Sequence, residues 1–197
     1  DELEDESEDE LEDEEEEEEE EGVDALESEV TELQGREIQD LLDRIQQGGS
    51  SLQDISRLRR LLDIVLRGAA NGNDIARRIL GVSSRSIMTI LKLPAETISN
   101  LGAGFINLAM RFLRGCYNLM PSLYEDIIPI IESFFELVRD GNEFSYEVLA
   151  ALINGFYSML PSIPNIRTPL FRLINACGDI IIAGIASASS LSDRGLR

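Results

Sequence analysis

The charge of this chain lies almost entirely at one end. Eighteen of the first 21 residues are Asp or Glu, and no basic residue precedes Gly35. Residues 1–34 carry a formal charge of −22, whereas residues 35–197 have 16 acidic and 17 basic side chains. A dense run of like charges repels itself and has no apolar surface to bury. We therefore expect a disordered polyacidic tail over residues 1–34, with a short amphipathic segment, and a single domain over residues 35–197.

That domain has the periodicity of α-helices, because apolar residues recur at every third or fourth position. A short stripe ends before Gly35, and a second, from Ile38 to Ile45, ends at Gly48. The residues from Ser51 to Asp54 match a capping box, which predicts a helix over 52–67. A further helix is predicted over 74–93, since Pro94 must end it.

The hydrophobic half, residues 94–197, contains an internal repeat with an offset of 40 residues. The sequence LRGCYNLMPSL at 113–123 matches INGFYSMLPSI at 153–163, and Pro129 and Pro169 keep the same offset. Each copy predicts a helix that ends before Pro121 or Pro161 and a second helix with Pro129 or Pro169 at its first position. Two copies fall short of the three that a solenoid usually needs. The sequence therefore favours an all-α compact bundle of six to eight helices with a duplicated helical hairpin.

The stretch from Ser51 to Lys92 contains eight basic residues, all but one of them arginine, and three aspartates. The candidate interaction residues in this stretch are Arg57, Arg59, Arg60, Arg77 and Arg78. They are the obvious partner for the acidic tail, and an ordinary solvated helix face is the alternative. The excess of positive charge is modest and few aromatic residues accompany it, so a nucleic-acid partner is disfavoured.

Aromatic residues of the hydrophobic half supply the other interaction candidates, which are Phe105, Phe112, Tyr117 and Tyr157. The segments 101–113 and 180–191 have the composition of sheltered amphipathic helices that could bind a membrane surface. Interior helices of the bundle are the alternative, because core helices are apolar nearly all round. Neither segment is long enough to span a bilayer.

Catalytic and metal-binding patterns are missing from the sequence. The chain has no histidine, which removes histidine-based triads, histidine metal sites and the commonest general base. Cys116 and Cys177 do not form a zinc pattern, and the sequence leaves open whether they pair or remain buried thiols. The dense carboxylates of the tail predict only weak, non-specific binding of divalent cations. We expect no enzyme activity, no cofactor and no specific metal site.

These observations predict a non-catalytic helical interaction or assembly protein, acting as a scaffold or structural component. Its partner would be another protein or a second copy of the chain, and the acidic tail would modulate solubility or binding to basic surfaces. A membrane-active protein that uses segments 101–113 and 180–191 is the alternative. The residues assign no cellular compartment.

Overall fold

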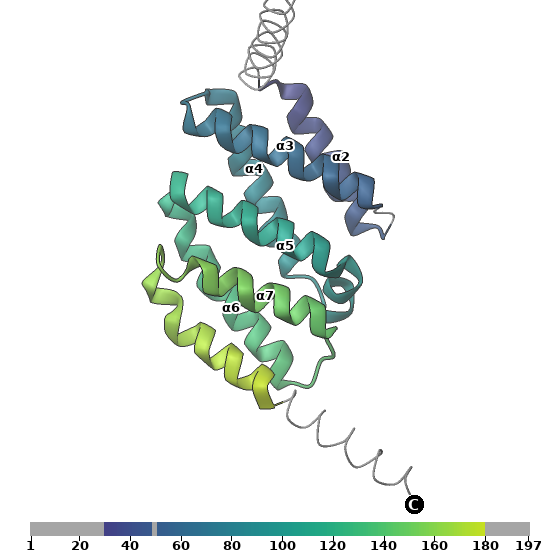
Figure 1. The fold of residues 1–197 in the computed structure, drawn as a ribbon, viewed down its shortest axis with the longest axis vertical. Coiled ribbons are helices and arrows are strands. Elements are labelled where there is room, and N and C mark those ends of the chain that lie inside the picture. Colours follow the sequence, from purple (N-terminus) through teal and green to yellow (C-terminus); the bar gives the residue numbers. More distant parts are fainter. Residues whose placement is uncertain (1–29, 49–50, 180–197) are drawn as a thin grey trace, which may run out of the picture.

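The computed structural model describes residues 30–48 and 51–179, and this part of the chain is all-helical (Figure 1). Its labelled helices are α2 (Glu32–Gln46), α3 (Leu52–Ala70), α4 (Asp74–Leu91), α5 (Ala95–Leu119), α6 (Tyr124–Arg139) and α7 (Tyr146–Met159). A helix over residues 167–179 follows, and the 3-10 turns are η1 (Pro121–Leu123) and η2 (Pro164–Ile166). The predicted all-α compact bundle is confirmed for these residues. The predicted acidic tail lies outside them as far as residue 29.

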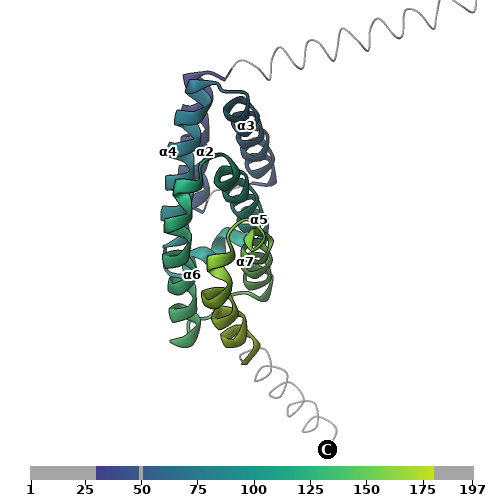
Figure 2. The same cartoon turned by 90° about the vertical axis from the view of Figure 1, so that its left-hand side faces the viewer.

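Successive helices alternate between two layers. Helices α3, α5 and α7 lie side by side in one layer, with α5 in contact with both of its neighbours. The view turned by 90° shows α2, α4 and α6 on the opposite side of the molecule (Figure 2). The described chain begins at one end of this stack, at α2, and reaches residue 179 at the other end. Each layer therefore has an outer surface built from several helices.

One continuous hydrophobic core joins the two layers and extends from Val30 to Cys177. Phe134 of α6 is almost fully buried, and its ring lies 6.1 Å from those of Phe144 and Phe156. Aromatic pairs at this spacing contribute about 0.5–1.5 kcal/mol beyond the burial of their area. The cluster ties α6 to α7 and to the connection between them.

Side-chain caps fix the starts of three helices. Ser51 Oγ accepts a hydrogen bond from the backbone N–H of Asp54 at 3.1 Å, which confirms the predicted start of α3. The Asp54 carboxylate lies 3.5 Å from Arg44 of α2, so it joins two helices in addition to its place in the first turn. Asn73 and Ser145 cap α4 and α7 in the same way. These local signals set where the long helices begin.

Three predicted helix starts are wrong. The helix expected to open with Pro169 begins at Arg167, so this proline is its third residue. Helix α2 runs through Gly35, because the glycine allows α4 to approach: a Cβ at this position would lie 3.0 Å from Ile79 Cγ1. Helix α6 begins at Tyr124, which places Pro129 inside the helix instead of at its first position. The additional turn buries Ile127 completely, and that burial offsets the backbone hydrogen bond that proline cannot make.

Helix α5 is interrupted near its start. Gly102 has φ +83° and ψ 160°, a conformation that is essentially restricted to glycine. The residues after it, including most of segment 101–113, form a long regular stretch that ends at Leu119. The interruption changes the direction of the helix between Leu101 and Phe105, which both belong to the core.

Candidate interaction surface

The outer surface of the α3–α5–α7 layer carries a group of exposed arginine and tyrosine side chains. We define this outer face by residues that are all exposed to solvent: Arg60 on α3, Asn107, Arg111 and Arg114 on α5, and Tyr146 and Tyr157 on α7. The side-by-side packing of the three helices makes the face continuous.

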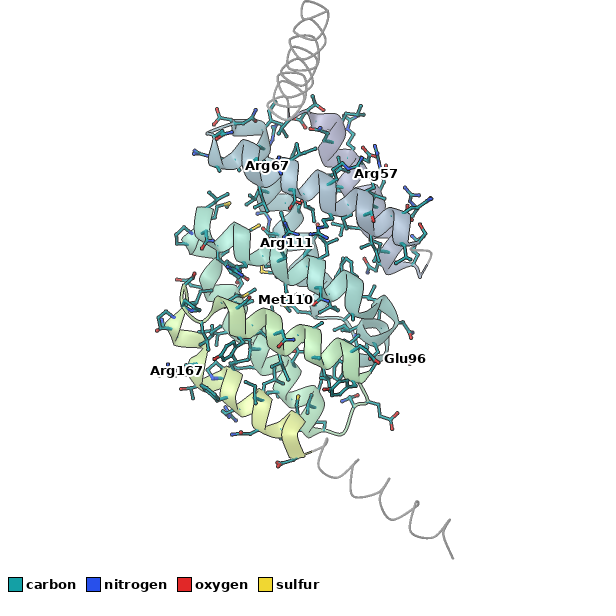
Figure 3. The ribbon with its side chains drawn as sticks, viewed as in Figure 1. Arg57, Arg67, Glu96, Met110, Arg111 and Arg167 are labelled. Carbon is teal, nitrogen blue, oxygen red and sulfur yellow. The ribbon has the colours of Figure 1, made fainter. Side chains whose placement is uncertain are left out.

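A close approach between α5 and α7 holds two of these helices together. Gly155 of α7 lies against Met110 of α5, and a Cβ built at Gly155 would be 2.4 Å from Met110 Cγ. Met110 is itself buried, whereas its neighbour Arg111 is exposed and reaches toward α3 (Figure 3). The contact brings the exposed edges of the two helices close enough to act as one surface.

Two tyrosines dominate the α7 part of the outer face. Tyr146 is 67% exposed and Tyr157 is 59% exposed. They are separated by eleven residues, which is close to three full helical turns, so both project from the same side of α7. Exposed tyrosine supplies a large contact area together with a hydroxyl, and it is enriched at the energetic centres of protein interfaces.

The α5 part of the face is polar and contains no acidic residue between Asn100 and Asn118. Its exposed positions recur at helical spacing and are occupied by asparagine, glycine and arginine: Asn100, Gly104, Asn107, Arg111, Arg114 and Asn118. Arg111 lies 3.7 Å from Asp63 of α3, an exposed contact of the kind that contributes little to stability. The face is therefore positively charged but not strongly so.

The arginines predicted from the sequence fall into different environments. Arg59 and Arg60 are exposed on α3. Arg57 donates to Glu37 of α2, and this hydrogen bond raises the pKa of its guanidinium. Arg78 of α4 pairs with Glu32 of α2, and Arg77 Nε donates to the Ala69 carbonyl at 3.4 Å. Arg57 and Arg78 thus contact α2 and Arg77 contacts the end of α3, whereas Arg59 and Arg60 project from α3 into solvent.

Three of the four predicted aromatic candidates are in the core. Phe105, Phe112 and Tyr117 are each at most 1% exposed, and only Tyr157 reaches the outer face. Burial, the largest cause, raises the pKa of the Tyr117 hydroxyl above its usual range. The three side chains pack in the hydrophobic core, as expected if segment 101–113 is an interior helix of the bundle and not a membrane-binding one.

The described residues contain no arrangement suited to metal binding or to thiol chemistry. No group of three or more Cys, Asp or Glu side chains within them could hold a metal ion. Cys116 and Cys177 are free and buried, and burial raises the pKa of both thiols. Because the thiolate is the reactive form, burial lowers the reactivity of both cysteines.

Segment 101–113 lies within α5 and most of its large apolar side chains face the core. Segment 180–191 lies outside the described residues. Within residues 30–48 and 51–179, no helix has the length and hydrophobicity needed to cross a membrane.

Sequence reasoning overlooked Tyr146 and did not recognise the stripe that it forms with Tyr157. Their spacing of eleven residues was the available signal, because positions that far apart share a helix face. Arg111 and Arg114 were visible at the edge of the hydrophobic segment, but their relation to α3 and α7 depends on the packing of helices distant in sequence.

Comparison with protein-family models, curated proteins and solved structures found no match to this chain.

Proposed function

We propose that this chain is a non-catalytic helical interaction protein that binds another protein, or a second copy of itself, through the outer face of α3, α5 and α7. The observation that carries this proposal is the pair of exposed tyrosines, Tyr146 and Tyr157, beside the exposed arginines of α5. Tyrosine and arginine are the residue types on which binding energy concentrates at protein interfaces.

The acidic segment, residues 1–21, modulates this interaction in our proposal. Each chain carries 18 carboxylates in that segment and a set of exposed arginines on the outer face. Attraction between exposed opposite charges is screened as ionic strength rises. The segment therefore competes with an external partner for Arg60, Arg111 and Arg114 at low salt, or links one copy to another.

We propose that α5 and α7 of the outer face are the first helices of two copies of a duplicated hairpin. The first copy consists of α5 and α6, and the second of α7 and the helix over residues 167–179. Two observations support the duplication: α5 and α7 both end just before the matched prolines, Pro121 and Pro161, and both belong to the same layer. The matched tyrosines differ in environment, since Tyr117 is buried in α5 and Tyr157 is exposed on α7, so the two copies contribute different surfaces.

A light-scattering measurement on the full chain tests the proposed function. We expect a mass above the single-chain value of 21.9 kDa, or capture of a discrete protein from lysate, with either result dependent on salt. The double variant Tyr146→Ser/Tyr157→Ser should abolish the result, whereas Phe171→Ser, which changes an aromatic residue that is 44% exposed on another helix, should not. A chain that stays monomeric at low and high salt and captures nothing through these tyrosines would refute the proposal.

A further inference from the structure

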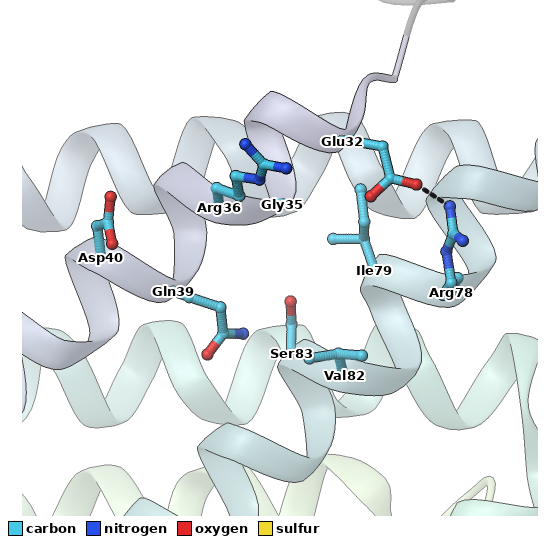
Figure 4. Close-up of a pocket in the computed structure, with 9 residues that line it drawn as sticks. All are labelled: Glu32, Gly35, Arg36, Gln39, Asp40, Arg78, Ile79, Val82 and Ser83. Carbon is cyan, nitrogen blue, oxygen red and sulfur yellow. Dashed lines mark hydrogen bonds and ion pairs between the residues drawn. The ribbon is translucent and has the colours of Figure 1, made fainter.

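A pocket of about 390 Å³ lies between α2 and α4, on the side of the molecule opposite the outer face (Figure 4). Residues from the first half of α2 form one wall, and residues from the first half of α4 form the other. The residues that the argument uses are Arg36, Gln39, Ile79, Val82 and Ser83.

The floor of the pocket contains two buried hydrogen-bond donors without a partner. Ser83 is 0% exposed, and neither its Oγ nor Gln39 Nε2 has a hydrogen-bond partner within the described part of the chain. Ser86 Oγ donates to Gln39 Oε1 at 3.2 Å, which directs the amide nitrogen away from that contact. Figure 4 shows this nitrogen directed toward Ser83. Buried donors that lack an acceptor cost free energy, so the site favours a ligand with acceptor oxygens.

The mouth of the pocket carries charges of both signs, because Glu32 and Asp40 line it together with Arg36 and Arg78, and Arg36 supplies its unpaired positive charge. Arg36 is exposed, and no carboxylate of residues 30–48 or 51–179 forms an ion pair with it. Arg78, at the other end of the pocket, is already paired with Glu32. Arg36 is therefore the cation placed to receive an anionic group above the two buried donors.

The remaining wall is apolar. Ile79 and Val82 of α4 line the pocket beside Ser83, and Gly35 of α2 packs closely against Ile79. This surface suits methylene groups and offers them no hydrogen bond. A ligand that fits both parts has a carboxylate at the end of a short aliphatic stem, as a glutamate side chain or a small dicarboxylate does.

We propose that the pocket between α2 and α4 binds a carboxylate carried on a short aliphatic stem. Arg36 pairs with the charge, Gln39 Nε2 and Ser83 Oγ donate to the carboxylate oxygens, and Ile79 and Val82 contact the stem. The carboxylate comes either from the acidic segment of the chain, which is tethered to α2 and so present at high effective concentration, or from a free small carboxylate.

The side-chain amide resonance of Gln39 reports directly on occupancy of the pocket. The resonance is assigned by its loss in Gln39→Leu and followed by NMR in two full-length proteins: the natural chain and a variant whose acidic residues within 1–21 are all replaced by Gln or Asn. Both are titrated with glutarate, and with glutaramide as a neutral probe of the same length. The exposed Gln53 amide on α3 serves as the reference.

If the acidic segment fills the pocket, neutralising it shifts the Gln39 amide, and glutarate then binds the variant but not the natural chain. If the source is a free carboxylate, glutarate shifts the Gln39 amide in both proteins. In either case glutaramide has little effect, Arg36→Gln weakens glutarate binding roughly ten-fold or more, and Arg59→Gln leaves it unchanged. The proposal is overturned if neither neutralisation nor glutarate moves the Gln39 amide more than the Gln53 amide.

Discussion

The close approach of α5 and α7 at Gly155 predicts that one added methyl group will destabilise the fold. A Cβ at Gly155 would lie 2.4 Å from Met110 Cγ and 2.5 Å from Met110 Cβ. Because Met110 Cβ is fixed to the backbone of α5, a change of rotamer cannot relieve the contact. The two helices must separate, and overpacking of this kind costs about 1–3 kcal/mol.

The same substitution at Gly81 is the matched control. Gly81 also lies inside a helix, α4, but the nearest atom to a Cβ there is Met120 Cε at 3.9 Å. Replacing glycine by alanine within a helix gains about 1 kcal/mol of helix propensity at either site. Gly81→Ala should therefore be about 1 kcal/mol more stable than the natural chain. The free energy of unfolding of Gly155→Ala should be roughly 1–3 kcal/mol lower than that of Gly81→Ala, because only Gly155→Ala overpacks a helix contact.

Urea unfolding followed by circular dichroism measures this difference, and thermal unfolding gives a second reading. In a domain of this size, 1 kcal/mol shifts the thermal midpoint by roughly 2–4 °C. A Gly155→Ala chain that is as stable as Gly81→Ala would refute the argument that α5 and α7 pack backbone against side chain at this point.

Four further outcomes are expected. Ser51→Ala should lower the free energy of unfolding by about 1 kcal/mol in a urea titration, because α3 loses its N-terminal cap. Gly102→Ala should lower it by about 1–3 kcal/mol, because alanine is strained at this backbone conformation; an unchanged urea midpoint would contradict the interruption in α5. Burial raises the pKa of Cys116 and Cys177, so the folded state holds their protons longer than the unfolded state. The free energy of unfolding should therefore fall as pH rises above the unfolded thiol pKa of about 8.5, and both thiols should resist iodoacetamide at neutral pH until urea is added. Deletion of residues 1–21 should leave the fold and its cooperative unfolding transition intact while increasing aggregation at low salt, and loss of the transition would show that the domain depends on the acidic segment.

Local sequence signals predicted the helices well where a cap or a proline acts on its own neighbours. Ser51 marks the start of α3, and Pro94 follows the end of α4 as expected. Gly35 and Pro129 do not mark helix boundaries in this protein, although both residue types usually do. The helix continues through Gly35 because α4 approaches α2 there, and it includes Pro129 because the additional turn buries Ile127. Both causes are contacts between distant parts of the chain, which a local sequence pattern does not contain.

The candidate surface was only partly predictable for the same reason. The apolar periodicity of α5 was compatible with a membrane-binding helix and with an interior helix, and it could not indicate whether Phe105 and Phe112 face the core or a partner. The outer face joins α3, α5 and α7, whose neighbours in space are not their neighbours in sequence. The pocket could not be predicted from the sequence. Its residues Gln39 and Ser83 come from two different helices, and neither belongs to a recognisable motif.

Site-specific photo-crosslinking most directly tests the claim that the outer face binds a protein. A photoreactive phenylalanine analogue replaces Tyr157, which is 59% exposed on the outer face, or Val82, which is 41% exposed on α4. We predict that the analogue at position 157 forms a discrete adduct, whose mass identifies a second copy or another protein, and that the analogue at position 82 does not form it. Absence of an adduct at position 157, or the same adduct from both positions, would contradict the account.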